Sequence, residues 1–219
     1  ASTHEFNEDY RLVTTEQQLD ALCDELMASE LIAVDTETQG LEYDDLIVGV
    51  CLSTTPGTGY YVPVRHEEYE GVLYPNQLPS TLVFDRLKES LETRPCVGHN
   101  IKFDQKMLWK DGIYCNFVAD TLAIAKLFGQ YPSNGLKFLV KHHFKHEMAA
   151  LESLFKSTGN RKPQIRPGIL SPEEICNYAV EDANWTLQLH QYYLSAMPSL
   201  HSNRLFNLEM QLLPCVGEI

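Results

Sequence analysis

Two acidic residues follow a short apolar run near the start of the sequence. Residues 31–34 are apolar and lead directly into Asp35, with Glu37 two positions later. This pattern predicts a buried strand, and because side chains alternate along a strand, the two carboxylates are expected to share one face. Neighbouring carboxylates repel each other, and a hard divalent cation such as Mg²⁺ or Mn²⁺ relieves that repulsion. Alone, such a pair is more typical of a solvated strand end, so a metal site requires further acids.

A third acid follows another short apolar stretch. Residues 96–98 predict a brief buried strand, and Asn100 is a favourable residue for capping the helix that comes next. With Asn100 as the N-cap, Asp104 lies about one turn into that helix and Phe103 packs inward beside it. A single acid in a first helical turn usually only favours the helix dipole. Asp104 therefore supports a metal site only in combination with the strand acids.

A long helix near the C-terminal end carries the fourth acid. Ser171 is a typical N-cap, followed by a proline at the first helical position and a glutamate that completes a capping box. The helix is predicted to run to about residue 196, and it places Tyr178 and Asp182 four residues apart on its core-facing side. Their polar ends need partners there. A Tyr–Asp hydrogen bond that only stabilises the helix is the simpler alternative.

The elements that position these residues predict an α/β fold. Short turns join three predicted strands, which suggests an antiparallel meander, because parallel neighbours need long crossovers; the strands are at 31–38, 46–52 and 60–64. Helices are predicted from Thr15 to about residue 30 and from Ser80, which is expected to be its N-cap. The strand at 96–98 then fits as a parallel addition to the meander. The prediction is a mixed sheet flanked by helices.

The remaining segments complete this outline. Residues 10–13 predict a short strand, and residues 65–79 are polar and turn-rich, which indicates a loop. Further helices are expected at 120–128 and 136–143. The last segment, 205–219, is apolar and helix-like.

Composition excludes some classes of function. The net charge is −13, with only 17 Lys and Arg residues, which argues against a protein that binds nucleic acid mainly by neutralising phosphates. It does not argue against a metal enzyme acting on phosphate esters, because the metals supply the positive charge. No apolar run reaches the ~20 residues of a membrane span, and no signal peptide opens the sequence. The six cysteines form no Cys-x-x-Cys pair, so a reduced, cytoplasmic protein is expected.

A cluster of histidines invites a zinc interpretation. His142, His143 and His146 lie close together in the sequence, but no cysteine pair or second histidine cluster accompanies them. A solvated basic face is the expected role of these three residues.

Three short motifs occur in a fixed order, and the sequence resembles the DEDD exonucleases of the tyrosine subtype. The motifs are Asp35-x-Glu37, Asn100-x-x-Phe103-Asp104 and Tyr178-x-x-x-Asp182. The resemblance is closest to the 3′–5′ proofreading domain of family A DNA polymerases. One departure is His99, which stands where that family usually has a glutamine. The resemblance implies a ribonuclease H-like fold, with an exonuclease domain over residues 1–200 and the start of a truncated polymerase domain at 201–219.

The resemblance also implies a chemistry and a substrate. Four carboxylates are expected to hold two divalent metal ions, Mg²⁺ or Mn²⁺; they are Asp35, Glu37, Asp104 and Asp182. Tyr178 is expected to orient the attacking water, because an unperturbed phenol titrates near pH ~10 and is a poor base. Substrate contacts are implied for Thr36, Leu41, Asn100 and Phe103, with Leu41 as a wedge between bases. The implied reaction releases 5′-mononucleotides from single-stranded or frayed DNA 3′ ends.

The implied partners are that DNA end and a polymerase domain in the same chain, without a membrane. The expected location is the cytoplasm, at the nucleoid in a bacterium, in the host cytoplasm for a phage protein, or in an organelle. Two alternatives stay open. One is an RNA-trimming exonuclease of the ribonuclease D kind, which shares the four acids. The other is a catalytically silent DEDD domain kept as a structural or DNA-binding module, although silent versions typically lose metal carboxylates.

Overall fold

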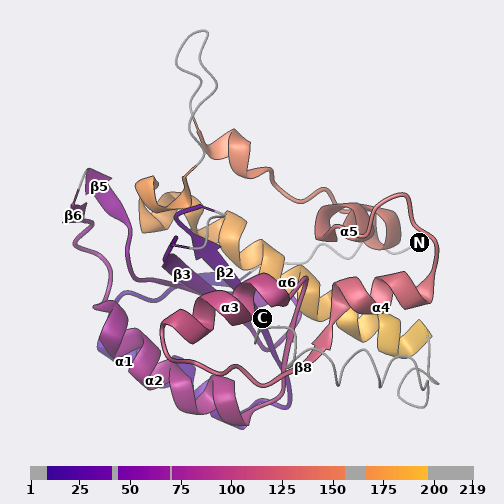
Figure 1. The fold of residues 1–219 in the computed structure, drawn as a ribbon, viewed down its shortest axis with the longest axis horizontal. Helices are drawn as coiled ribbons and strands as arrows, with labels where there is room; N and C mark the ends of the chain where they lie inside the picture. The colour runs from indigo at the N-terminus through magenta and orange to yellow at the C-terminus, as the bar shows by residue number, and fades with distance from the viewer. Residues whose placement is uncertain (1–8, 41–43, 70, 156–165, 197–219) are drawn as a thin grey trace, which may run out of the picture.

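The centre of the protein is a six-stranded mixed sheet in the order β1-β4-β3-β2-β7-β8 (Figure 1). The computed structural model describes residues 9–40, 44–69, 71–155 and 166–196. The strands of the sheet are Asp9–Leu12 (β1), Ile32–Thr38 (β2), Ile47–Ser53 (β3), Thr58–Pro63 (β4), Cys96–Gly98 (β7) and Phe117–Asp120 (β8). A separate hairpin consists of Glu67–Tyr69 (β5) and Val72–Leu73 (β6).

Strand pairing confirms the predicted meander. Strands β2, β3 and β4 are antiparallel neighbours, while β7 pairs parallel to β2 and β8 pairs parallel to β7. Strand β1 closes the other edge by pairing parallel to β4. The helix between β4 and β7 supplies the long connection that a parallel strand requires.

In the described part of the chain, six α-helices surround the sheet. They are Glu16–Ala28 (α1), Ser80–Thr93 (α2), Lys102–Lys110 (α3), Thr121–Phe128 (α4), Leu136–Phe144 (α5) and Pro172–Ala196 (α6), with 3₁₀ turns at Leu151–Leu154 and Pro167–Ile169. Helices α1 and α2 pack against each other and against one face of the sheet, whereas α6 crosses the opposite face with α4 and α5 beside it (Figure 1).

Strand β2 shows how this arrangement selects side chains for the site. Ile32 and Val34 join the core cluster beneath α1 and α2, and Ala33 joins the cluster on the α6 side. By alternation, Asp35 and Glu37 follow Ala33 on the face that α6 covers. Covering both faces of β2 therefore delivers two carboxylates into the interior rather than to solvent.

The two helix starts that the sequence signals most clearly are confirmed. At α1, the Thr15 hydroxyl accepts from the amide of Gln18 (3.3 Å) while the Gln18 side chain accepts from the amide of Thr15 (3.1 Å). Ser171 and Glu174 make the same reciprocal pair at α6, at 3.3 and 3.0 Å. Each box satisfies amides that otherwise lack partners at a helix N-terminus.

Three local predictions are wrong. Ser80 is the first residue of α2 rather than its cap, because Pro79 occupies the N-cap position without a side-chain hydrogen bond. The loop predicted at 65–79 contains the β5–β6 hairpin. Strand β8 was not expected; its four residues are too short for a periodic signal, and pairing with β7 defines them. The predicted helix at 205–219 lies outside the described residues.

Gly49 on β3 offers a test of sheet packing. A Cβ at this position would overlap the phenol of Tyr61, which is fully buried and held by a 2.6 Å hydrogen bond to the ring of His66. Overpacking of this kind costs about 1–3 kcal/mol. We expect Gly49→Ala to lower the free energy of unfolding by that amount, measured by chemical denaturation. The control is Gly129→Ala, whose added Cβ makes only ordinary contacts; equal stability of the two variants would contradict this packing.

Candidate active site

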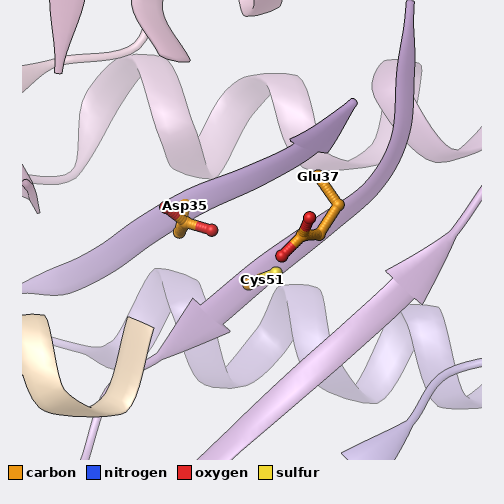
Figure 2. Close-up of side chains that lie close together, drawn as sticks. All are labelled: Asp35, Glu37 and Cys51. Atoms are coloured by element: carbon orange, nitrogen blue, oxygen red, sulfur yellow. The ribbon is translucent and has the colours of Figure 1, made fainter. Parts of the chain in front are cut away.

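The strand acids lie together with a cysteine from the neighbouring strand. Asp35 on β2 is paired directly with Cys51 on β3, and Glu37 with Gly49. Ligand atoms of Asp35, Glu37 and Cys51 all lie within 4.8 Å of one another, and Figure 2 shows the three side chains on one side of the two strands. Cys51 and Glu37 are buried, and Asp35 is half-buried. The β2–β3 part of the site therefore consists of two carboxylates beside a thiol.

Asp104 approaches from the first turn of α3 and is held by β2 itself. The amide and hydroxyl of Thr36 both donate to Asp104 Oδ1, at 3.0 and 2.6 Å. Thr36, predicted as a substrate contact, therefore positions an acid in this structure, and any contact with substrate stays a prediction. Asp104 is only 4% exposed, so these two donors replace water for one of its oxygens.

The predicted cap of α3 is wrong. Asn100 has a left-handed φ of 64° and makes no side-chain cap, since the N-cap position belongs to Ile101. The carboxylate of Asp120, at the end of β8, accepts instead from the amides of Asn100 (2.8 Å) and Ile101 (3.3 Å). Asp120 also caps α4 through the amide of Leu122 (2.9 Å). One side chain from an unpredicted strand therefore fixes the start of the helix that carries Asp104.

Helix α6 brings Tyr178 and Asp182 to the same place. The charge of Asp182 raises the pKa values of Asp35 and Glu37, after burial as the main cause. Burial also raises the pKa of Tyr178, and Asp182 is the largest charge that adds to the effect. All five residues predicted as catalytic are thus brought together, although Asp104 and Asp182 lie outside the 4.8 Å group around Asp35.

Burial raises the pKa of every acid in the site, and the charges of neighbouring acids add to the effect. Glu37 reaches about 8, with the charges of Asp182 and Asp104 adding to burial. Asp182 reaches about 7, and Asp104 also reaches about 7 although its Thr36 donors act in the opposite direction. The pKa of Asp35 is raised well above its usual value by burial and by Asp104, Asp182 and Glu37. Raised pKa values of this kind are typical of buried acids that lack a nearby cation.

Lys137 on α5 is a residue of the site that sequence reasoning missed. Its charge lowers the pKa values of both Glu37 and Asp182, and its ammonium lies 4.9 Å from the centre of the Tyr178 ring. It also donates to the carbonyl of Ala149 (2.7 Å). In the sequence it occupies an ordinary exposed position of a predicted helix, so only the packing of α5 against α6 reveals its place.

The histidines in the last turn of α5 and just after it are not a uniformly solvated face. His142 is exposed as expected, but His143 packs against Tyr192 with ring centres 4.5 Å apart. His146 stacks on Trp185 at 4.6 Å and hydrogen-bonds Glu181 at 2.7 Å. These contacts join the end of α5 and the segment after it to α6. Among the described residues, the three histidines form no metal-binding group.

A cleft of about 340 Å³ opens beside the carboxylates. It is lined by Thr36, Glu37, Thr38, Gly40, Phe103, Leu151 and Pro167. Phe103 lines this cleft, and its contact with substrate stays a prediction. Asn100 is exposed and lines a different hollow of about 240 Å³, together with Lys102 and Lys126. The fourth predicted contact, Leu41, lies outside the described residues.

Known proteins share this fold and sequence. A family model described as a 3′-5′ exonuclease matches residues 10–197. DNA polymerase I of Pseudomonas aeruginosa is 31% identical over 229 residues, covering 96% of this chain and 23% of that protein. The structure of Escherichia coli RNase D, an exoribonuclease involved in structured RNA processing, is similar with a TM-score of 0.69 at 17% identity, covering 96% of this chain and 51% of that one. Brucella melitensis NrnC with bound Mg²⁺ is similar with a TM-score of 0.59 at 16% identity, covering 89% and 86%.

The structural likenesses establish the ribonuclease H-like fold that the motifs implied. The chain spans only 20–23% of the length of the bacterial DNA polymerase I sequences that it matches. Within the described ranges, no helix is long and apolar enough to cross a bilayer. The family match extends from β1 to the end of α6 and so includes all five converging site residues. The chain belongs to the 3′-5′ exonuclease family and is an exonuclease domain of the DNA polymerase I type.

Proposed function

We propose that this domain removes 5′-mononucleotides from the 3′ end of DNA and serves as the proofreading domain of a longer family A DNA polymerase. The observation that carries the proposal is the convergence of four carboxylates and Tyr178 from three separate elements, β2, α3 and α6. A structural module without catalysis has no need to keep repelling acids buried together. The small share of the DNA polymerase I relatives that this chain spans supports a polymerase domain in the same protein.

The donor set fits two divalent metal ions, Mg²⁺ or Mn²⁺. All four acids offer carboxylate oxygens, which these hard cations prefer; they are Asp35, Glu37, Asp104 and Asp182. Burial and the charges of Asp182 and Asp104 raise the pKa of the Glu37 carboxylate, and Lys137 opposes this rise only in part, so a bound cation would stabilise its ionised form. When bound, such ions supply Lewis acidity and positive charge at the phosphate undergoing hydrolysis.

Tyr178 orients the attacking water in this proposal. Its raised pKa keeps the phenol protonated at neutral pH, so it donates or accepts a hydrogen bond and does not act as a base. The ammonium of Lys137 beside its ring adds a fixed positive charge on the α5 side of the acids. In this proposal Tyr178 positions the water, and the charge of Lys137 attracts the phosphate.

The substrate form follows from charge and shape. A domain of net charge −13 cannot hold a duplex by counterion release, and an acidic surface repels it. The cleft beside Glu37 offers the ring of Phe103 as an apolar surface for a base, and stacking of this kind contributes about 1–3 kcal/mol per base. The 3′ terminus therefore enters as a single strand or as a frayed end.

RNA trimming is the second candidate function, because RNase D has the same fold. That likeness rests on 17% identity and concerns the fold, whereas the sequence relatives at 28–31% identity are DNA polymerases. DNA is thus the favoured substrate.

Neutralising one site acid tests the proposal directly. We expect Asp35→Asn and Asp182→Asn each to reduce Mg²⁺-supported nucleotide release by about 10²- to 10³-fold or more, because each removes a charge that stabilises the reaction centre. The matched control is Asp85→Asn, an exposed acid on α2. Products are identified as 5′-mononucleotides by chromatography. Folded variants with wild-type rates would exclude the assignment.

The same assay separates the candidate substrates. Matched DNA and RNA oligonucleotides are offered to the wild type, with 3′ ends that are single-stranded, mismatched or fully paired. DNA should be degraded faster than RNA, and paired ends slowly, in proportion to their fraying. A preference for RNA would instead support the alternative function, an RNA-trimming exonuclease of the ribonuclease D kind. Equal rates on GC-rich paired and single-stranded ends would show active melting and overturn the substrate form.

Tyr178→Phe should reduce single-turnover rates by about 10- to 10³-fold while the protein still folds and binds DNA, because it removes one orienting hydrogen bond. Tyr192→Phe is the control, since Tyr192 lies on the same helix but packs against Phe128 away from the acids. An unchanged single-turnover rate in Tyr178→Phe would contradict the orienting role and leave Tyr178 with a role in packing only.

Metal removal should make stability depend on pH in a defined direction. The pKa values of Glu37 (about 8), Asp104 (about 7) and Asp182 (about 7) are raised, so the native state retains protons that the unfolded state has lost. Between pH 6.5 and 8.5 the stability of the EDTA-treated protein should therefore fall, by about 1–3 kcal/mol. This window avoids His66 and His99, whose pKa values of about 4 act only at lower pH.

Thermal denaturation with EDTA and with Mg²⁺ measures this effect. Added Mg²⁺ should stabilise the protein more at pH 8.5 than at pH 6.5, because ionised carboxylates bind it better. Asp104→Asn should show a shallower pH dependence without metal. A stability that is flat or rising with pH in EDTA would contradict the mutual repulsion of these acids.

A further inference from the structure

Lys137 occupies a position in α5 that the helix itself does not favour. It is the second residue of α5, whose N-terminus has no side-chain cap and no acid in its first turn. The positive end of the helix dipole lies there, so a cation is unfavourable at this end and favourable at the other. Lysine and methionine have similar helix propensities, so the stability of α5 gives no reason for a lysine here. The reason has to lie in what its ammonium contacts.

The ammonium of Lys137 has two partners from outside α5. It donates to the carbonyl of Ala149 (2.7 Å), and it lies 4.9 Å from the centre of the Tyr178 ring. A cation within about 6 Å of the centre of an aromatic ring is attracted by the electrons of the ring face. One side chain therefore joins α5, the segment after it and α6.

The peptide groups of Ala149 are held by both helices. Its carbonyl accepts from Lys137, and its amide donates to the buried carboxylate of Glu181 (2.8 Å), which also hydrogen-bonds the ring of His146 (2.7 Å). Glu181 and Tyr178 are three residues apart on α6 and so lie on neighbouring turns of one side of the helix. Because Ala149 is fixed to α6 in this way, it gives the Lys137 ammonium a fixed place beside Tyr178.

Tyr178 needs such support, because packing encloses only part of its ring. The residue is half-buried, and a hollow of about 430 Å³ opens beside it, lined also by Tyr10, Ala149 and Leu154. A ring with an open side is less firmly held than one that is packed all round. A displacement of about 1 Å in a group that orients a reactant can cost about 10²-fold in rate.

We infer that Lys137 is a positioning residue of the exonuclease site, which fixes the ring of Tyr178 and thereby aims its hydroxyl at the attacking water. The inference rests on the proposed function, since there Tyr178 orients that water. It goes beyond attraction of the phosphate by the Lys137 charge, because a charge acts in the same way with or without the Tyr178 hydroxyl. The two roles therefore predict different kinetics.

A double-mutant cycle separates these roles. Single-turnover rates are measured with Mg²⁺ and single-stranded DNA at saturating enzyme, where attraction of the substrate no longer limits the rate. We expect Lys137→Met to lower this rate about 10-fold in the wild type but less than about 2-fold in the Tyr178→Phe background. No loss in the wild type, or an equal loss in both backgrounds, would show that Lys137 does not act through Tyr178 and would overturn the inference.

Lys141→Met is the matched control, because it removes the same charge from the same helix. Lys141 pairs with Glu147 on the surface, where both side chains are exposed, and such a pair contributes little. Both variants replace an exposed lysine by a residue of similar helix propensity, so both should fold. The rate of Lys141→Met should stay within about 2-fold of the wild type. A loss as large as that of Lys137→Met would attribute the effect to net charge and reject the positioning role.

A spectroscopic measurement keeps this inference separate from the proposed function. With 3-fluorotyrosine at position 178, the fluorine-19 resonance reports the surroundings of the ring in the metal-free protein, without any reaction. It should shift in Lys137→Met and keep its position in Lys141→Met. An unmoved resonance in folded Lys137→Met overturns the inference even where the wild type is active. A shifted resonance in a protein that releases no nucleotide rejects the exonuclease assignment but not the placement of Tyr178 by Lys137.

Discussion

Repulsion among buried carboxylates is the constraint around which this domain is arranged. Two unit charges 4 Å apart at an effective dielectric constant near 20 repel by about 4 kcal/mol. The acids of β2, α3 and α6 lie close enough for their charges to raise pKa values within the site. Without metal, this repulsion lowers the stability of the folded protein. The site can persist only because the sheet and the helices around it bury enough apolar surface elsewhere.

Rigid anchors keep each acid in place against that repulsion. Strand β2 is covered on both faces, Thr36 holds Asp104, and Asp120 fixes the start of α3. Helix α6 contacts β1, β2, β3, β4 and β7, so Tyr178 and Asp182 cannot withdraw from the strand acids. A preorganised negative site of this kind binds cations without further reorganisation, which is what metal-assisted hydrolysis requires.

The same rigidity fixes the neighbours of the strand acids. Asp35 and Cys51 are paired across β2 and β3, so the strand register fixes the separation of their backbones. The buried thiol of Cys51 therefore stays beside the carboxylates of Asp35 and Glu37.

The sequence by itself determined the local elements and the order of the acids. The alternation of β2, the capping box of α6 and the four-residue spacing of Tyr178 and Asp182 all follow from periods that neighbouring residues define. Tertiary structure alone decided the rest. Strand β8, the capping of α3 by Asp120, the approach of Lys137 and the pairing of Cys51 with Asp35 each join residues distant in sequence. No local period encodes such contacts, because they depend on how the sheet and helices pack in space.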